Sequence, residues 1–581
     1  MNILTMDLTR GVTGLRTAED RFVEEYAGGR GTAVRLVFDL MKSGQEALDP
    51  ASPIVFATGP LTGTPFPMGG RFMAAAKSPL TNTIFSSSCG GRLGVYLRKS
   101  GIDVLVVTGA AARPSYLAIE DGDARLLDAS PIWGKEKAHV KEYLRERHGR
   151  DVSVMLIGKA GETKVLFANI ENDGRYLGRG GLGAVLGSKN LKAVVVSGRA
   201  RPKIGIPDAE QFSFLAYECK KWLSANPVTS QALPVFGTGV LFNLMRETGM
   251  LSVKNYGQAA SLESSALSGE MVTSRLLRRR RACPFCPVAC GRVTRYGDGP
   301  EYESLWSLGA NLLVHDLEEV ARLNGLCNEV GMDTISAGAV IAQAGELAEK
   351  GIADMPKTVY GNPGAIARLI GQIAERTGPG AILSLGTRKM AEHLETTDGE
   401  AHVKGLELPA YDPRGAYGNA LGYATSNRGG CHLPGYLIGT EILGIPKLLD
   451  RFAVQGKASL LALNQNAFAF MDTMILCRFA AFAVPTDYYA RIASAASGRK
   501  TSWEESLRIG ERIWNLERLF NLREGVEADG LPARLTTFPL EEMLQEYYAF
   551  RGWDEKGVPT GEKLGELGLT IDDGRTKGVD R

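Results

Sequence analysis

LKAVVVSGRARPKIGIPDAE, residues 191–210, divides the chain into two parts with different sequence patterns. Its first segment, LKAVVVSG (191–198), is a short β-branched run that ends at glycine, which is typical of a strand. The next segment, GRARPKIGIPD (198–208), combines glycine, proline and charge, which is typical of a connection. From Ala209 onward the pattern is mostly helical. We therefore expect a β-rich N-terminal domain that ends near this stretch, with helical structure beyond it.

Three more runs of the same kind lie N-terminal to this stretch, and each ends at glycine: IVFATG (54–59), VLVVTG (104–109) and VSVMLIG (152–158). On the C-terminal side an alanine-rich segment (337–351) predicts a helix, and a loop-like segment (406–436) interrupts the helical pattern. Beyond it, apolar residues recur at helical spacing: Ile509, Ile513, Leu516 and Phe520. We predict an α+β fold with a β-rich domain followed by two mostly helical domains: residues 1–204, 205–405 and 406–581.

Composition excludes several classes of function. The chain has 581 residues, enough for two to four domains, and Lys+Arg 67 nearly balance Asp+Glu 65. This balance gives no support to nucleic-acid or membrane binding as the main activity. The N-terminus lacks an apolar signal segment, and Asp472 and Arg478 interrupt the most apolar late segment (466–484). We expect a cytoplasmic protein in which clustered cysteines bind metal, since eight cysteines are few for a disulfide framework of this size.

The segment RACPFCPVACGRV (281–293) carries three cysteines in the pattern C-x2-C-x3-C: Cys283, Cys286 and Cys290. A structural zinc site needs two close ligand pairs, and the sequence has no second C-x-x-C or H-x3-5-H. A redox dithiol would leave Cys290 unused. A cubane iron–sulfur cluster takes three thiolates from one tight loop and a fourth from far along the chain. The pattern favours iron–sulfur, but the spacing does not choose the fourth ligand among Cys89, Cys219, Cys327, Cys431 and Cys477.

Four arginines, Arg278 to Arg281, directly precede the cysteine cluster. One interpretation is a solvated helix end, which is the usual meaning of a charge run. The other is a docking patch for an acidic electron carrier. The sequence leaves both open.

Glycine–arginine loops form the second distinctive pattern. GRGGLG (178–183) formally matches G-x-G-x-x-G, but no predicted strand precedes it and no acidic residue lies about twenty positions later. Dinucleotide binding is therefore not favoured. Bare amides beside Arg175 and Arg179 would instead cradle phosphate. Since three similar loops occur elsewhere, we expect a large polyanionic cofactor held from several sides: residues 59–71, 86–91 and 426–430.

These segments resemble the tungsten-containing aldehyde:ferredoxin oxidoreductases, in the same order and through almost the whole chain. The matching strings are GPLTGTPFPMGGR, GRGGLGAVLGSKNLKA, CPFCPVAC, GPEYESLWSLGAN, ELPAYDPRGAYGNALGYATSNRGGCH and IGERIWNLERLFNLREG. The resemblance implies that the β-rich domain is the base for tungsten held by two pterin dithiolenes (tungsten-bis-pterin), with Mg²⁺ bridging the pterin phosphates. Two helical domains then cover the cofactor, and one [4Fe–4S] cluster carries electrons outward.

The resemblance also assigns cofactor residues. DTMILC (472–477) matches the motif that ends in the fourth cluster cysteine, which nominates Cys477 and places Asp472 and Leu476 at a pterin; Ile475 replaces the motif's glycine. NEVGM (328–332) matches the other pterin motif, with Asn328 in place of its aspartate, then Met332 and Asp333. Further positions match residues that contact the pterins or their phosphates, although Ser88 replaces an amide side chain: Arg71, Ser88, Gly90, Arg175, Tyr176, Gly178, Arg179 and Arg428. An inter-subunit iron site is not expected, because its Glu-x-x-His ligands are Arg322 and Gly325 here.

For the reaction, the resemblance places Glu303 and His432 near the metal, as a general base and as a hydrogen-bond donor to the substrate carbonyl. It implies oxidation of aldehydes to carboxylic acids, with electrons passing to ferredoxin or a ferredoxin-like subunit, and an oligomeric enzyme. A second hypothesis is a reductase subunit for aromatic acyl-CoA thioesters in a larger complex. A third is an electron-transfer protein that holds only the iron–sulfur cluster.

Overall fold

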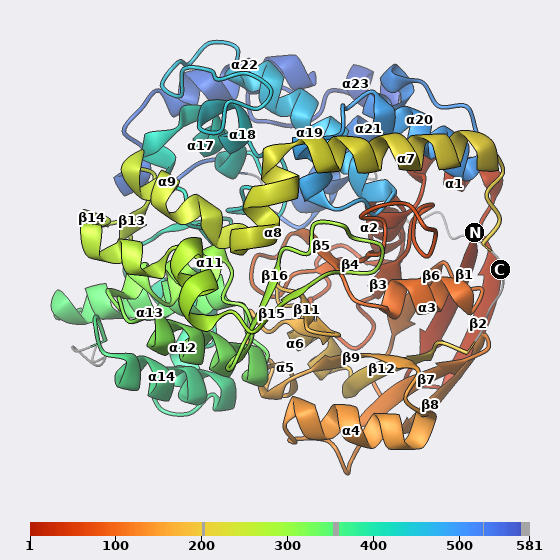
Figure 1. The fold of residues 1–581 in the computed structure, drawn as a ribbon, viewed down its shortest axis with the longest axis horizontal. Helices are drawn as coiled ribbons and strands as arrows, with labels where there is room; N and C mark the ends of the chain where they lie inside the picture. The colour runs from red at the N-terminus through yellow and green to blue at the C-terminus, as the bar shows by residue number, and fades with distance from the viewer. Residues whose placement is uncertain (200–203, 353–358, 527, 571–581) are drawn as a thin grey trace.

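The computed structural model describes residues 1–199, 204–352, 359–526 and 528–570. Two mixed sheets lie within the first two hundred residues, and most of the rest is helical, so the predicted α+β class is confirmed. Figure 1 shows the sheets on one side, the helices α11–α14 (within residues 302–375) on the other, and α17–α23 (within residues 417–567) above both. The predicted connection at 198–208 includes residues 200–203, which lie outside the described residues.

Each sheet has six strands. The first has the order β2 (Val12–Thr17), β1 (Asn2–Asp7), β6 (Val104–Thr108), β3 (Ile54–Ala57), β4 (Phe72–Lys77), β5 (Ile84–Cys89). The second has the order β11 (Arg175–Leu177), β10 (Ile170–Asn172), β9 (Val152–Ile157), β12 (Leu191–Ser197), β7 (Ser115–Glu120), β8 (Asp123–Asp128). Only β1–β6 and β12–β7 pair in parallel among these strands. The four predicted strands are confirmed as β3, β6, β9 and β12.

Burial explains why these strands are continuous apolar runs. Every residue of β3, β9 and β12 is buried, which is expected when both faces of a sheet are covered. One core cluster joins side chains of both sheets, for example Phe56 and Leu105 of the first with Leu117 and Met155 of the second. The opposite face of the first sheet packs against α2 (Gly29–Leu40), α19 (Lys457–Thr473) and α21 (Trp503–Arg523).

The two helices predicted from sequence are present, and one further helix lies in a segment expected to be a loop. Most of the alanine-rich segment (337–351) lies in α13 (Thr334–Glu349), and α21 buries the apolar face predicted for it. The segment 406–436, expected as a loop, contains the helix α17 (Tyr417–Ala424). Its first amides donate to a buried carboxylate distant in sequence: the N–H groups of Gly418 and Asn419 bond Glu441 at 2.9 Å each. Because the capping group lies outside the segment, its sequence shows no helix start signal.

The arginine run forms a strand, so the interpretation as a helix end is wrong. β15 (Arg279–Arg281) pairs with β16 (Gly291–Thr294), which in turn pairs with β17 (Gly297–Asp298). The cysteine loop connects β15 to β16. This small sheet therefore holds both ends of the loop in register.

One described segment, Val228–Glu247, is long and apolar enough to cross a membrane by length and composition alone. It is divided in this structure, because α8 (Leu233–Phe236) ends where Gly237 takes a φ of 65°, before α9 (Leu241–Glu247).

Candidate active site

A cavity of about 960 Å³ lies where the β-rich part meets the helices, and it collects most of the residues named from the sequence. Its walls include Arg71, Gly90, Arg175, Tyr176, Gly178, Arg179, Cys283, Cys286, Cys290, Glu303, Asn328, Met332, Asp333, His432 and Cys477. These residues come from segments up to four hundred positions apart. The chain therefore brings the cysteine loop, the glycine–arginine loops and the two proposed catalytic side chains to one space.

The backbone of Met68 joins the two cysteine-bearing segments. Its N–H donates to the carbonyl oxygen of Phe285 at 3.0 Å, inside the cysteine loop, and its carbonyl accepts from the N–H of Cys477 at 3.2 Å. Cys477 directly precedes the turn η7 (Arg478–Phe482) and is half-buried, like the three cysteines of the loop. The other four cysteines are buried. Two distant cysteines, Cys431 and Cys477, line the cavity with the loop. Of these two, Cys477 is half-buried like the loop cysteines and is linked to the loop through Met68, so it is the better candidate for the fourth ligand.

The chemistry of the four thiols fits a cluster better than a single ion. Among the described residues, no three His, Cys, Asp or Glu side chains lie close enough together to hold one metal ion. A zinc ion requires such a group with ligands at about 2.0–2.3 Å, whereas an iron–sulfur cluster spreads its thiolates over several iron atoms. Burial raises the pKa of Cys286 to about 11 and also raises that of Cys290, so metal binding must displace their protons.

The arginines of the cavity wall are held in place by side chains of neighbouring loops. Arg71 donates from Nε to Oγ of Ser88 at 3.0 Å and from Nη2 to the Ser88 carbonyl at 3.1 Å. Arg179 donates from Nε to Oδ2 of Asp333 at 2.9 Å. Asp333 also caps α13 through the N–H of Ile335. Ser88 and Asp333 therefore orient the guanidinium groups that face the cavity.

Several polar groups of the wall have capacity left for a ligand. Among the buried atoms of the described chain, Nε of Arg175, Oδ1 of Asn169 and Nη1 of Arg478 have no hydrogen-bond partner. All three residues line the cavity, and nothing lies within 4 Å of the position of a Cβ on Gly178. Buried donors and acceptors without partners are costly unless a ligand satisfies them. The donor set and the space fit a large anionic group with hydrogen-bonding edges, as the implied pterin cofactor has.

Four of the residues named from the sequence do not line this cavity: Ser88, Arg428, Asp472 and Leu476. Asp472 is engaged from two sides, by Nη1 of Arg30 at 3.3 Å and by Nη2 of Arg478 at 2.9 Å. Leu476 is buried in the core against the first sheet. In this structure they support the wall from behind. The sequence did not single out Arg478 as a site residue, although it follows Cys477 directly.

The backbone conformation of Ile475 explains why the motif that DTMILC (472–477) matches has glycine at this position. Its φ is 61°, in the left-handed region, where a β-branched residue is strongly disfavoured. The Ile475 side chain fits because Gly29 and Gly59 beside it have no side chain. A Cβ on Gly29 would lie 2.6 Å from Cδ1 of Ile475, and a Cβ on Gly59 would lie 2.8 Å from its Cγ1. The substitution of glycine by Ile475 thus keeps the backbone turn that delivers Cys477.

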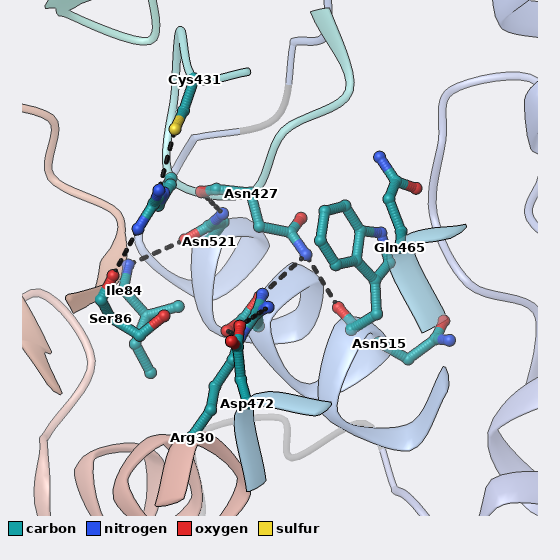
Figure 2. A network of polar contacts seen from close by, with 12 residues as sticks. Arg30, Ile84, Ser86, Asn427, Cys431, Gln465, Asp472, Asn515 and Asn521 are labelled. Carbon is teal, nitrogen blue, oxygen red and sulfur yellow. Dashed lines mark hydrogen bonds and ion pairs between the residues drawn. The ribbon is translucent and has the colours of Figure 1, made fainter. Parts of the chain in front are cut away.

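A polar network holds the loop 426–431, which leads to His432 (Figure 2). Arg428 donates to the Ser86 carbonyl at 2.6 Å and to the Cys431 thiol at 2.8 Å. Asn521 of α21 donates to the Asn427 carbonyl at 2.7 Å and accepts from the N–H of Ile84 at 3.0 Å. The network joins β5, the loop 426–431 and α21. Arg428 therefore positions this loop in the structure.

Glu303 and His432 face each other across a short gap. Oε2 of Glu303 accepts from the N–H of Ala410 at 2.9 Å. Its Oε1 and Nδ1 of His432 are 3.8 Å apart, and neither has a hydrogen-bond partner in the described part of the chain. Such a distance is too long for a direct hydrogen bond, and both atoms are free to contact a ligand atom between them.

Burial sets the protonation of this pair. It raises the pKa of Glu303 to about 7, so the carboxyl group can gain or lose a proton near neutral pH. Burial, together with the charges of Arg179 and Arg428, lowers the pKa of His432 to about 3. The imidazole is therefore neutral, with one N–H to donate. A proton acceptor and a neutral donor directed at one point are suited to carbonyl chemistry.

Aromatic rings, which the sequence did not single out, surround this pair. The ring centroids of Tyr411 and His432 are 5.0 Å apart, those of His432 and Tyr436 are 5.8 Å apart, and those of Tyr436 and Phe482 are 6.0 Å apart. The hydroxyl of Tyr302 donates to the Ala410 carbonyl at 2.9 Å, beside the amide that binds Glu303. The rings fix the imidazole and give the cavity an apolar wall. Only the adjacency of Tyr302 to Glu303 could have indicated this role from sequence.

Comparison with known proteins adds two family matches. The model described as aldehyde ferredoxin oxidoreductase, N-terminal domain, matches residues 3–198. The model described as aldehyde ferredoxin oxidoreductase, domains 2 and 3, matches residues 215–569. Together they span nearly all of the described chain.

Similar full-length proteins agree with these matches. The tungsten-containing aldehyde ferredoxin oxidoreductases of Pyrococcus furiosus and Pyrococcus abyssi are each 41% identical to the chain. The alignments cover 97% and 98% of the chain, respectively, and 98% of each relative. A solved structure, the active site complex BamBC of benzoyl coenzyme A reductase with 1,5-dienoyl-CoA, has a TM-score of 0.86 at 25% identity. It covers 98% of this chain and 96% of its own.

Proposed function

The chain belongs to the aldehyde ferredoxin oxidoreductase family, and on this premise we propose that it oxidises aldehydes to carboxylic acids with water as the oxygen source. Electrons then pass through an iron–sulfur cluster to ferredoxin or a ferredoxin-like subunit, in the cytoplasm. The observation that carries the proposal is the free Oε1 of Glu303 opposite the free Nδ1 of His432, 3.8 Å away, in a cavity that is also lined by Cys283, Cys286, Cys290 and Cys477.

We assign the cofactor groups to parts of the wall. Cys283, Cys286, Cys290 and Cys477 hold a [4Fe–4S] cluster. Arg71, Arg175 and Arg179 bind the anionic parts of two pterins, and Oδ1 of Asn169 accepts a hydrogen bond from a ring amino group. Mg²⁺, when bound, would balance the negative charge of the pterin phosphates. Bound tungsten supplies two-electron chemistry between W(VI) and W(IV).

The protein provides proton transfer and orientation at the substrate. The N–H of Ala410 holds Oε2 of Glu303, which leaves Oε1 to accept a proton from water or from the hydrated aldehyde. The neutral imidazole of His432 donates from Nδ1 to the substrate oxygen and stabilises the charge that develops there. Packing of His432 between Tyr411 and Tyr436 fixes the direction of this donor. The tautomer with hydrogen on Nδ1 is part of the proposal.

A reductase of aromatic acyl-CoA thioesters, our second hypothesis from sequence, has less support. Benzoyl coenzyme A reductase is represented by a structural neighbour at 25% identity, compared with 41% for the aldehyde ferredoxin oxidoreductases. No residue of the described cavity favours a thioester over an aldehyde.

The decisive experiment is anaerobic purification, elemental analysis for tungsten and iron, and viologen reduction with a panel of aldehydes. We expect about one tungsten and four iron atoms per chain, on the cluster stoichiometry, and aldehyde-dependent dye reduction. Metal-loaded protein that fails to reduce viologen with every aldehyde of the panel would contradict the proposal. Protein that contains iron but no tungsten would also contradict it. The second result would favour an electron-transfer protein.

A further inference from the structure

The arginine run has free charge on the protein surface. Arg278, Arg279 and Arg280 are exposed, and none of their side chains forms an ion pair or hydrogen bond with another described residue. They lie on and beside the edge strand β15, directly before the cysteine loop. An edge strand with unpaired arginines does not stabilise the fold through these side chains, and their charges are available to a partner.

A surface groove of about 540 Å³ connects these arginines to the cluster loop. Its walls contain Arg92, Arg175, Arg279 and Arg281, and the same groove reaches Ala282, Cys283 and Pro284. One proposed cluster ligand, Cys283, is therefore reached both from the large cavity and from the surface. This groove therefore connects solvent to one of the proposed cluster ligands.

Most of the carboxylates that pair with these arginines do not line the groove. Arg175 pairs with Glu301 at 3.1 Å, and Arg281 pairs with Asp298; both carboxylates line the large cavity and not the groove. In the groove itself, Asp173 is the acidic residue and pairs with Arg92 at 3.2 Å. The surface that faces solvent thus carries excess positive charge, although the whole chain has a net charge of only +2.

Beside the groove, the cysteine loop exposes an aromatic ring. Phe285 is 44% exposed and lies between Cys283 and Cys286, with a φ of 59°. Its backbone is fixed by the N–H of Met68 at 3.0 Å, so the ring extends from a rigid support. Aromatic residues and arginine are enriched at protein interfaces, and an exposed phenylalanine in a strained conformation is unusual on a free surface.

We propose that this surface, which we call the arginine groove (Arg92, Arg278–Arg281 and Phe285), docks an acidic iron–sulfur electron carrier of the ferredoxin type. The carrier's acidic face pairs with the free arginines, Phe285 forms the apolar contact, and the carrier's cluster faces Cys283. This inference rests on the proposed function. Each aldehyde and water molecule yields a carboxylic acid, two protons and two electrons, so two oxidised carriers are each reduced by one electron in successive encounters. Small, charge-steered interfaces are typical of such redox partners.

The test measures binding and turnover separately. The probe is a purified acidic two-[4Fe–4S] ferredoxin, bound to immobilised holoenzyme at several salt concentrations. The variant is Arg279→Glu/Arg280→Glu, and the matched control is Lys42→Glu/Lys556→Glu, which changes the charge equally at exposed lysines that line neither cavity. We expect about a tenfold or greater loss of ferredoxin affinity at low salt, a weaker salt dependence, and unchanged viologen reduction, while the control binds like the wild type.

A second variant separates the apolar contact from the charges. Phe285→Gly keeps the left-handed backbone and removes the ring, so affinity should fall with an unchanged salt dependence. Wild-type affinity in both variants would overturn the docking surface and leave the proposed function intact. The binding assay does not depend on aldehyde turnover, so an enzyme inactive with aldehydes would contradict the proposed function and still report on docking.

Discussion

The two ends of the large cavity differ in the burial and pairing of their polar groups. At the catalytic end, Glu303 and His432 are buried with one free polar atom each, and burial shifts both pKa values toward the neutral form. At the cluster end, Arg175 and Arg281 form ion pairs, and Arg278–Arg280 are exposed to solvent; the buried Nε of Arg175 and Nη1 of Arg478 are left for the cofactor. The catalytic end leaves capacity that a substrate fills, whereas the cluster end presents charge that a partner protein meets. This difference matches chemistry on a small molecule at one end and electron exit at the other.

Loss of a cluster ligand should have the largest effect, because it removes electron transfer at the cluster end and turnover at the catalytic end. Cys477→Ala removes the proposed fourth thiolate and keeps the backbone link to the 283–290 loop through Met68, so we expect loss or conversion of the reduced-state EPR signal and near-complete loss of viologen reduction. Cys219→Ala, at a buried cysteine that lines neither cavity, should keep four iron atoms and full activity, on the same stoichiometry. An unchanged EPR signal in Cys477→Ala would assign the fourth ligand elsewhere.

Removal of the base should have the next largest effect. Glu303→Gln keeps the shape and the hydrogen bond from Ala410 but cannot accept the proton, so kcat/KM for aldehydes should fall about 10²- to 10⁴-fold. Tungsten and iron content and ferredoxin affinity should match the wild type, because the cluster end is untouched. Full aldehyde activity in metal-loaded Glu303→Gln would exclude this residue as the base.

The pH should affect only the catalytic end. There kcat/KM should change about tenfold per pH unit, whereas ferredoxin affinity at the cluster end should not change. Because burial raises the pKa of Glu303 to about 7, the carboxylate is protonated and inactive as a base below that pH and ionised above it. We expect kcat/KM to rise about tenfold per unit up to about pH 7 and then to level off. Ferredoxin affinity should stay constant from about pH 6 to 8, since arginine does not titrate there. A flat activity profile over this range would contradict the assignment of Glu303.

The sequence predicted the fold in outline because its signals were local. β-branched runs that end at glycine became β3, β6, β9 and β12, and apolar spacing became α21. The resemblance to the oxidoreductase family, read from motifs, is confirmed by the family matches. Local signals failed where a partner came from far away: α17 is capped by Glu441, and Arg278–Arg281 became a strand by pairing with β16.

The candidate site shows the same limit. One reason for rejecting dinucleotide binding at residues 178–183 was wrong, because the short strand β11 precedes this loop and the helix α6 (Leu182–Ser188) follows it. The rejection still stands on geometry, since β11 pairs antiparallel with β10 and no parallel β–α–β unit forms. The unpaired Nη1 of Arg478 and the aromatic rings around His432 could not be predicted from sequence, because they depend on contacts between distant segments.

The smallest effect compares two phenylalanines, one at each end. Phe482 lines the cavity beyond Tyr436, so Phe482→Ala should raise KM for benzaldehyde about three- to tenfold through loss of ring contact and leave acetaldehyde within about twofold. Phe285→Gly, at the exposed ring of the cysteine loop, should leave both KM values unchanged and weaken only ferredoxin binding. If Phe482→Ala changed ferredoxin affinity, or Phe285→Gly changed KM for benzaldehyde, the two ends would not be functionally separate. If each substitution acts only at its own end, the cavity has one wall for the substrate and another for the electron carrier.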